Sequence, residues 1–132
     1  MIKIKVFIPH RWETGCIDDY KIISGLLDRS KYVINNYSIP KNNPLNHIDR
    51  RYNVDPQIAS KIKYASIVVC SNRPAFSGGM AIKEIKYAIS CNKPIVAIRL
   101  TQYTNSELLR QGIEVISNRK DSLEKWISMH LK

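Results

Sequence analysis

The stretch SIVVCSNRPAFSGGMAIKEIKYAISCNKPIVAIRL, residues 66–100, contains two apolar runs separated by a helical pattern. The first run, SIVVC, and the second, PIVAIRL, have the length and continuous apolar character of buried strands. Between them, apolar residues recur at helical spacing after the glycine pair at 78 and 79. Two strands joined by one helix form a parallel unit with a right-handed crossover, so this stretch predicts a parallel sheet.

The same alternation precedes this unit. A first strand is expected at residues 4–8, where Pro9 ends it, and a helix over about 17–29 follows. The run YVINNYSI at 32–39 predicts a second strand, and a long polar loop separates it from a helix that begins at residue 55 or 56. The N-terminal half therefore has the order strand, helix, strand, helix.

The alternation also continues after residue 100. A short helix capped by Asn105 or Ser106 is expected first, then a strand at 113–116, then a last helix capped by Asp121 or Ser122. No repeat or linker interrupts the chain. Five strands alternating with about five helices predict a single α/β domain over residues 1–132, with a parallel sheet covered on both faces.

Composition limits the classes of function. The 132 residues carry 21 Lys and Arg against 11 Asp and Glu, a net charge of +10, which favours an anionic ligand or an ordinary solvated basic surface. The cysteines at 16, 70 and 91 have no metal-site or disulfide spacing, so a reducing cytoplasm is expected. Lysines interrupt the apolar N-terminus, which argues against a signal peptide or a membrane span.

Polar loops follow the first three expected strands: PHRWETG, PKNNPLNHIDRR and SNRPAFSGG. In open α/β sheets, ligands bind beyond the carboxyl ends of the strands, where these loops meet. Arginines beside an indole suit a ligand with phosphates and a flat ring, although exposed arginines are usually only solvated and Trp12 could equally cap the sheet edge. No Walker loop, G-x-G-x-x-G, G-x-S-x-G or H-E-x-x-H motif occurs.

Glu84 is an acid on the helix after the glycine pair. Met80, Glu84 and Tyr87 follow one another at i, i+4 and i+7 and share one stripe of that helix. The side expected to face the sheet is apolar and consists of Ala81, Ile82, Ile85, Ala88 and Ile89. A structural explanation of Glu84 is a first-turn acid favoured by the helix dipole, or a partner of a nearby lysine.

Four motifs in order resemble a known family. They are FIPH at 7–10, NYSIP at 36–40, MAIKEI at 80–85 and NKPIVAIR at 92–99. Together they are similar to the bacterial TIR-like domains (the Toll/interleukin-1 receptor fold), in the branch that contains the ThsB sensors of Thoeris anti-phage defence. Pro9 and Met80 depart from the family pattern, which usually has serine and tryptophan there. The resemblance implies a flavodoxin-like, three-layer TIR fold with a five-stranded parallel sheet.

The resemblance also implies an activity. TIR enzymes cleave the nicotinamide–ribose bond of NAD and release ADP-ribose or a cyclic isomer as a signal, with NAD as substrate and no cofactor or metal. Glu84 takes the position of their catalytic glutamate. The remaining substrate-binding candidates line the nicotinamide and ribose side or offer polar and apolar contacts: Phe7, His10, Arg11, Trp12, Ser38, Asn43, Ser71, Asn72, Ser77 and Met80.

Partners are implied in the same way: a homo-oligomer, a phage-derived trigger and a separate effector that receives the signal, with no specific nucleic acid and no membrane. Two other functions stay open. One is a non-enzymatic TIR adaptor that works by self-association or partner binding. The other is an N-glycosidic enzyme resembling nucleoside deoxyribosyltransferases, which also use a glutamate; the absence of a matching second acid before the Gly-Gly pair counts against it.

Overall fold

The computed structural model describes residues 3–9, 17–36, 56–72, 80–100, 102 and 106–131. Five strands form one sheet: β1 (Lys3–Phe7), β2 (Val33–Asn36), β3 (Ile67–Ser71), β4 (Ile95–Ile98) and β5 (Glu114–Ile116). Five helices follow them in alternation: α1 (Ile17–Arg29), α2 (Pro56–Tyr64), α3 (Met80–Ser90), α4 (Ser106–Arg110) and α5 (Lys120–His130). The strand and helix order predicted from the sequence is confirmed.

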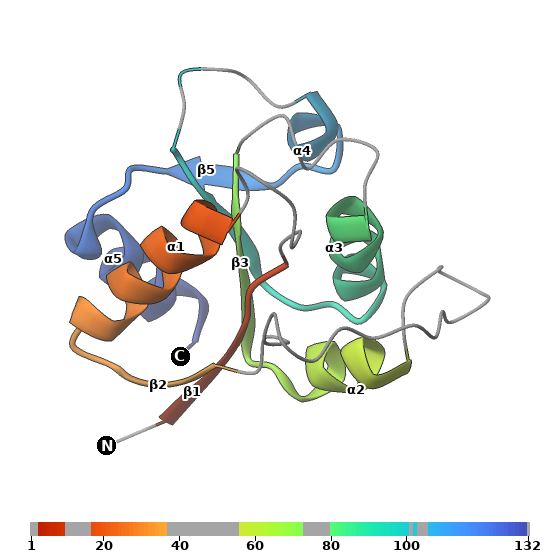
Figure 1. Ribbon diagram of the computed structural model, residues 1–132, viewed down its shortest axis with the longest axis horizontal. Helices are drawn as coiled ribbons and strands as arrows, with labels where there is room; N and C mark the ends of the chain where they lie inside the picture. Colours follow the sequence, from red (N-terminus) through yellow and green to blue (C-terminus); the bar gives the residue numbers. More distant parts are fainter. Residues whose placement is uncertain are drawn as a thin grey trace.

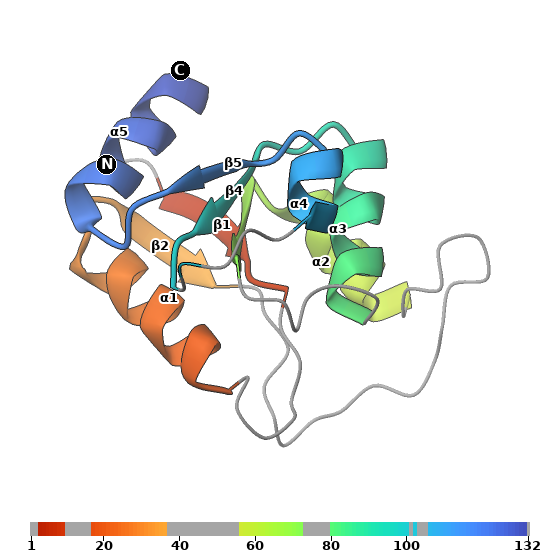
Figure 2. The same cartoon turned by 90° about the horizontal axis from the view of Figure 1, so that it is seen from above.

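The sheet is parallel throughout, with the strand order β2-β1-β3-β4-β5. This is the flavodoxin-like order, in which the chain first builds outward from β1 to β2 and then crosses to β3 on the other side. Helices α1 and α5 cover one face, and α2, α3 and α4 cover the other (Figure 1, Figure 2). The expected three-layer α/β architecture is therefore confirmed.

Strand alternation divides the core between the two faces of the sheet. Alternate residues of β1, β3 and β4, such as Val6, Val69 and Val96, pack with buried side chains of α1 and α5. The intervening residues Phe7 and Val68 pack against α2 and α3 instead. Because both faces are covered, the central strand β3 is apolar at successive positions and fully buried.

Two local expectations are wrong. Helix α5 begins at Lys120 with Arg119 as its N-cap and no side-chain cap, whereas Asp121 or Ser122 had been expected to cap it. The N–H of Arg119 donates to the Ser117 carbonyl in a tight turn, so the chain enters the helix two residues earlier than the polar residues suggest. Of the two N-caps expected for α4, Ser106 is the first residue of the helix itself, and Asn105 lies outside the described residues.

Helix α3 also differs in detail from the expected sheet-facing side. Ile85 and Ala88 are fully buried, as predicted, but Ile89 is 36% exposed, so it does not face the sheet. The buried stripe is rotated toward Glu84 and Tyr87, because α3 packs against α2 as well as against the sheet. Asn92, with a φ of 58°, then reverses the chain after the helix and leads it into β4.

Candidate functional site

Glu84 lies at the level of the carboxyl end of β3. Helix α3 runs antiparallel to the strands, and at its base the N–H of Val68 donates to the Pro94 carbonyl at 2.9 Å. From Ser90 back to Glu84 the helix rises roughly 9 Å at 1.5 Å per residue. The strand from Val68 to Ser71 climbs roughly 10 Å over the same height. Glu84 is therefore placed beside the last residues of β3, where α/β folds of this kind bind ligands.

The direction of the side chain follows from its neighbours on α3. Tyr87 and Ala88, three and four residues later, belong to one buried cluster with side chains of α2, β1 and β3. Glu84 lies one turn before them on the same side of the helix, and helical side chains lean toward the N-terminus of their helix. The carboxyl group thus lies on the side of α3 that faces α2 and the boundary between β1 and β3. In the order β2-β1-β3-β4-β5 this boundary is the switch point at which the strand order reverses.

The Glu84 carboxyl group is almost completely removed from water. Its side chain is 5% exposed, and burial raises its pKa from 4.5 to about 8. Within the described part of the chain, no hydrogen bond or ion pair reaches this group. An acid buried without a partner is costly to the fold, since removing a carboxylate from water is unfavourable unless another group compensates. Such an acid is a functional-site candidate.

Tyr87 shows the contrast one turn along α3. Burial raises the pKa of its hydroxyl, a hydrogen-bonding interaction with Cys91 raises it further, and Lys63 of α2 opposes the shift. The Tyr87 hydroxyl group is therefore partnered at the base of the helix, away from the carboxyl end of the sheet. Glu84 and Tyr87 lie on one stripe, yet among the residues that the structure describes only Tyr87 has partners.

The other described candidates have separate environments. Phe7, the last residue of β1, is buried in the cluster that contains side chains of α2 and α3. Asn72 is buried just beyond β3, where its Oδ1 accepts a 2.8 Å hydrogen bond from the Leu100 N–H and its own N–H donates to the Ile98 carbonyl. Ser71 is fully buried, and by strand alternation it lies on the α1 and α5 face with Val69. The structure thus brings Phe7 to the Glu84 side and places Ser71 on the opposite face.

The remaining candidates cannot be located. His10, Arg11, Trp12, Ser38, Asn43 and Ser77 lie outside the described residues. Met80 is the first residue of α3, but its side chain is not among those described. The roles assigned to these seven residues stay predictions.

Among the described residues, the site offers one carboxyl group and an apolar surround. These residues contain no group of three or more His, Cys, Asp or Glu side chains arranged to hold a metal ion. In its charged form, a buried carboxylate strongly stabilises a positive charge that develops beside it, because little water screens the interaction. The arrangement therefore suits a reaction in which cationic character grows on a bound substrate.

The comparisons with known proteins assign no family. The chain matches no model of a protein family and shows no similarity to a curated protein strong enough to count as a relative. Among the helices described, none is both long enough and apolar enough to cross a membrane.

A pocket of about 430 Å³ lies away from Glu84, between β5 and α5. Its lining residues are Glu114, Val115, Ile116, Ser117, Ser122, Lys125, Trp126 and Met129. Sequence reasoning selected none of them, because residues 113–131 read only as a strand and a helix. One signal was available: Ser122, Lys125, Trp126 and Met129 recur at helical spacing and mix polar with apolar types.

Proposed function

We propose that this protein is an NAD-consuming enzyme of the TIR type, in which Glu84 acts on the nicotinamide–ribose bond. The observation that carries the proposal is the buried Glu84 carboxyl group, without a partner in the described residues, at the carboxyl end of the β1–β3 boundary. The four TIR-like motifs supply the substrate class. The product is ADP-ribose or a cyclic isomer, used as a signal in anti-phage defence.

The chemistry requires Glu84 in its charged form. When the bond between the ribose carbon and the nicotinamide nitrogen breaks, its electron pair goes to the nitrogen, and the cationic ring departs neutral without a general acid. Positive charge then grows on the ribose, where a carboxylate stabilises it. Water or the adenine ring attacks the same carbon, and the proton released by water can go to Glu84.

A pKa of about 8 does not conflict with this role. The substrate brings a positive nicotinamide ring into the site, and a nearby opposite charge favours the carboxylate over the neutral acid. Substrate binding and ionisation of Glu84 therefore support each other. Because NAD is a compound of the cell interior, the proposal places the protein in the cytoplasm, as a homo-oligomer that passes its product to a separate effector.

The test is to incubate the purified, concentrated protein with NAD, with and without phage lysate, and to separate the products by chromatography and mass. We expect nicotinamide together with ADP-ribose or a cyclic isomer. E84Q should lower turnover by a factor of about 100 or more, because the amide is nearly isosteric but carries no charge. D28N is the matched control, since it removes an exposed carboxylate of α1.

The alternatives give different results. An adaptor would leave NAD intact under every condition while still associating with itself or a partner. An enzyme of the deoxyribosyltransferase type would leave NAD intact but exchange the bases of deoxynucleosides. NAD cleavage at the wild-type rate by E84Q would refute the role of Glu84.

A further inference from the structure

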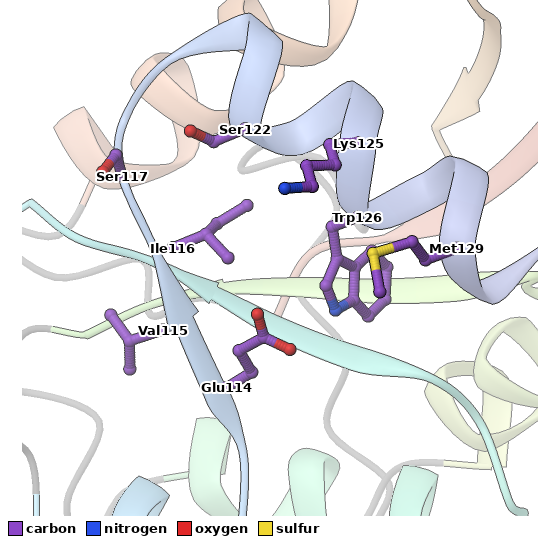
Figure 3. A pocket seen from close by; sticks show the side chains of 8 residues that line it. All are labelled: Glu114, Val115, Ile116, Ser117, Ser122, Lys125, Trp126 and Met129. Carbon is purple, nitrogen blue, oxygen red and sulfur yellow. The ribbon is translucent and has the colours of Figure 1, made fainter.

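The pocket between β5 and α5 is independent of the Glu84 site, because it lies on the other face of the sheet. Strand β5 ends at Ile116, the turn spans residues 117–119, and α5 begins at Lys120, so strand and helix diverge from this turn. Figure 3 shows the resulting wedge, with Ser117 and Ser122 near its closed end and Glu114 and Met129 near its open end. The wedge therefore opens along β5.

The wedge is held open by contacts elsewhere in the fold. Glu124 of α5 accepts a 2.6 Å hydrogen bond from the Lys31 N–H, which ties the middle of the helix to the turn before β2. Leu123 and Ile127 are buried in the core with residues of α1. With α5 anchored on that side, it cannot close onto β5, so the hollow is pre-formed.

The floor of the wedge is apolar and ordered. The Trp126 ring stacks on the His130 ring with centroids 4.2 Å apart, and the His130 Nδ1 lies 2.8 Å from the Trp126 carbonyl oxygen. Trp126 itself is only 3% exposed, whereas the Met129 side chain, which also lines the wedge, is 59% exposed (Figure 3). The exposed thioether of Met129, next to a ring that is held by stacking, is a suitable seat for an apolar side chain.

Strand β5 contributes backbone groups along the open side of the wedge. In the described sheet β5 pairs only with β4, so it is an edge strand. The N–H of Arg99 donates to the Ile116 carbonyl at 2.9 Å, which shows that the Ile116 backbone faces β4. Because backbone groups alternate along a strand, the N–H and C=O of Val115 point outward. An edge of this kind accepts an added strand.

The charges select the kind of segment. Lys125 and Glu114 both line the wedge, so its lining carries one charge of each sign, and within the described residues no hydrogen bond or ion pair engages the Lys125 ammonium group. The whole chain carries +10, which favours an acidic partner and disfavours a second copy of itself. We propose that β5 and α5 bind an extended, acidic segment of another protein, which adds as a strand beside Val115 and seats an apolar side chain over Trp126 and Met129.

Because the edge strand is short, strand pairing and the apolar seat must both contribute to the affinity for the segment. Strand β5 has three residues, so strand addition supplies few hydrogen bonds, and the apolar seat must provide most of the affinity. The binding should therefore depend on both the backbone of Val115 and the side chain of Met129.

The probe is the fluorescent heptapeptide Thr-Glu-Val-Leu-Val-Glu-Thr, whose leucine and two glutamates share one face when it is extended. Its control replaces both glutamates with lysine. We expect saturable binding of the acidic peptide by fluorescence anisotropy, and about tenfold weaker binding of the lysine peptide. K125E should reverse this preference, which a purely structural role of Lys125 would not do.

Two variants test the geometry. V115P removes an N–H that is not used in the β4–β5 ladder, so the fold should tolerate it while strand addition is blocked. M129E places a charge on the apolar seat. Each should weaken peptide binding about tenfold or more, whereas V115T and the distant K86E should change it by about twofold or less.

Circular dichroism and thermal unfolding of V115P establish that it is folded before its binding is interpreted. If V115P does not fold, M129E and the charge reversal by K125E decide the question. Absence of binding by the acidic peptide, or equal binding by V115P and V115T, would overturn the proposal. So would a concentration-dependent dimer of the wild-type protein that V115P abolishes, since the edge would then belong to a second copy.

Discussion

Replacing Glu84 by glutamine should make the protein more stable, and the gain should depend on pH. The folded protein holds the Glu84 proton up to a pKa of about 8, whereas the unfolded chain releases it near 4.5. Between these values the folded state binds more protons than the unfolded state, so the stability that Glu84 contributes is complete below pH 4.5 and is lost as pH rises toward 8. The neutral glutamine side chain has no such loss.

The magnitude follows from the two pKa values of Glu84. The difference between 4.5 and about 8 corresponds to roughly 5 kcal/mol, because each pKa unit is worth about 1.36 kcal/mol. Entry of water beside α3 reduces this value, so we expect E84Q to exceed the wild type by roughly 2 to 5 kcal/mol at pH 8 and by about 1 kcal/mol or less at pH 5. A domain of this size has a total stability of about 5–15 kcal/mol, so the effect is large.

The assay is urea unfolding followed by circular dichroism at pH 5, 6.5 and 8, for the wild type, E84Q and D28N. Other titrating groups affect the wild type and each variant alike and cancel in the difference. D28N is the matched control, because it removes an exposed carboxylate of α1 in place of the buried one. A constant difference between the wild type and E84Q from pH 5 to pH 8 would refute the burial of Glu84 without a partner in the described part of the chain.

Three further predictions concern activity and local structure. If the carboxylate is the active form of Glu84, kcat/KM for NAD should rise about tenfold per pH unit up to a pKa of about 8 and then level off; a flat profile from pH 6 to 9 would contradict this. N72A should lower the free energy of unfolding by roughly 1–3 kcal/mol, because the Leu100 N–H loses its acceptor, and urea titration measures the loss. G112A should cost about 1 kcal/mol through its φ of 74° alone, since nothing lies within 4 Å of an added Cβ; unchanged thermal stability would be the contrary result.

The order of strands and helices could be predicted because each element has a recognisable local sequence pattern. The run at residues 67–70 is continuously apolar, as a strand buried on both faces must be, and the helix after the glycine pair has the helical period. The cap of α5 was missed because the turn at Ser117 and Arg119, and not a polar side chain, starts that helix. The expectation for Ile89 was wrong because the sequence of α3 does not show that the helix also packs against α2.

The site was predicted less completely. The stripe of Glu84 and Tyr87 indicated that the carboxyl group would not point into plain solvent, but its isolation from partners depends on how α2, α3 and β1 pack together. The face of Ser71 follows from the strand register, which no motif contains. The wedge beside β5 arises because β5 and α5 diverge, so the sequence of either element alone does not predict it.

Cys70 lies beneath the same helix as Glu84, in a cluster with Ile85 and Ala97. Burial raises the pKa of its thiol to about 12, so it is almost never the reactive thiolate in the folded protein. Cys91, at the end of α3, is only half-buried. Alkylation of Cys70 therefore requires the cluster formed with α3 and α4 to open, and its rate reports local opening of this region. A ligand that holds α3 in place would slow the alkylation of Cys70 and leave the labelling of Cys91 unchanged.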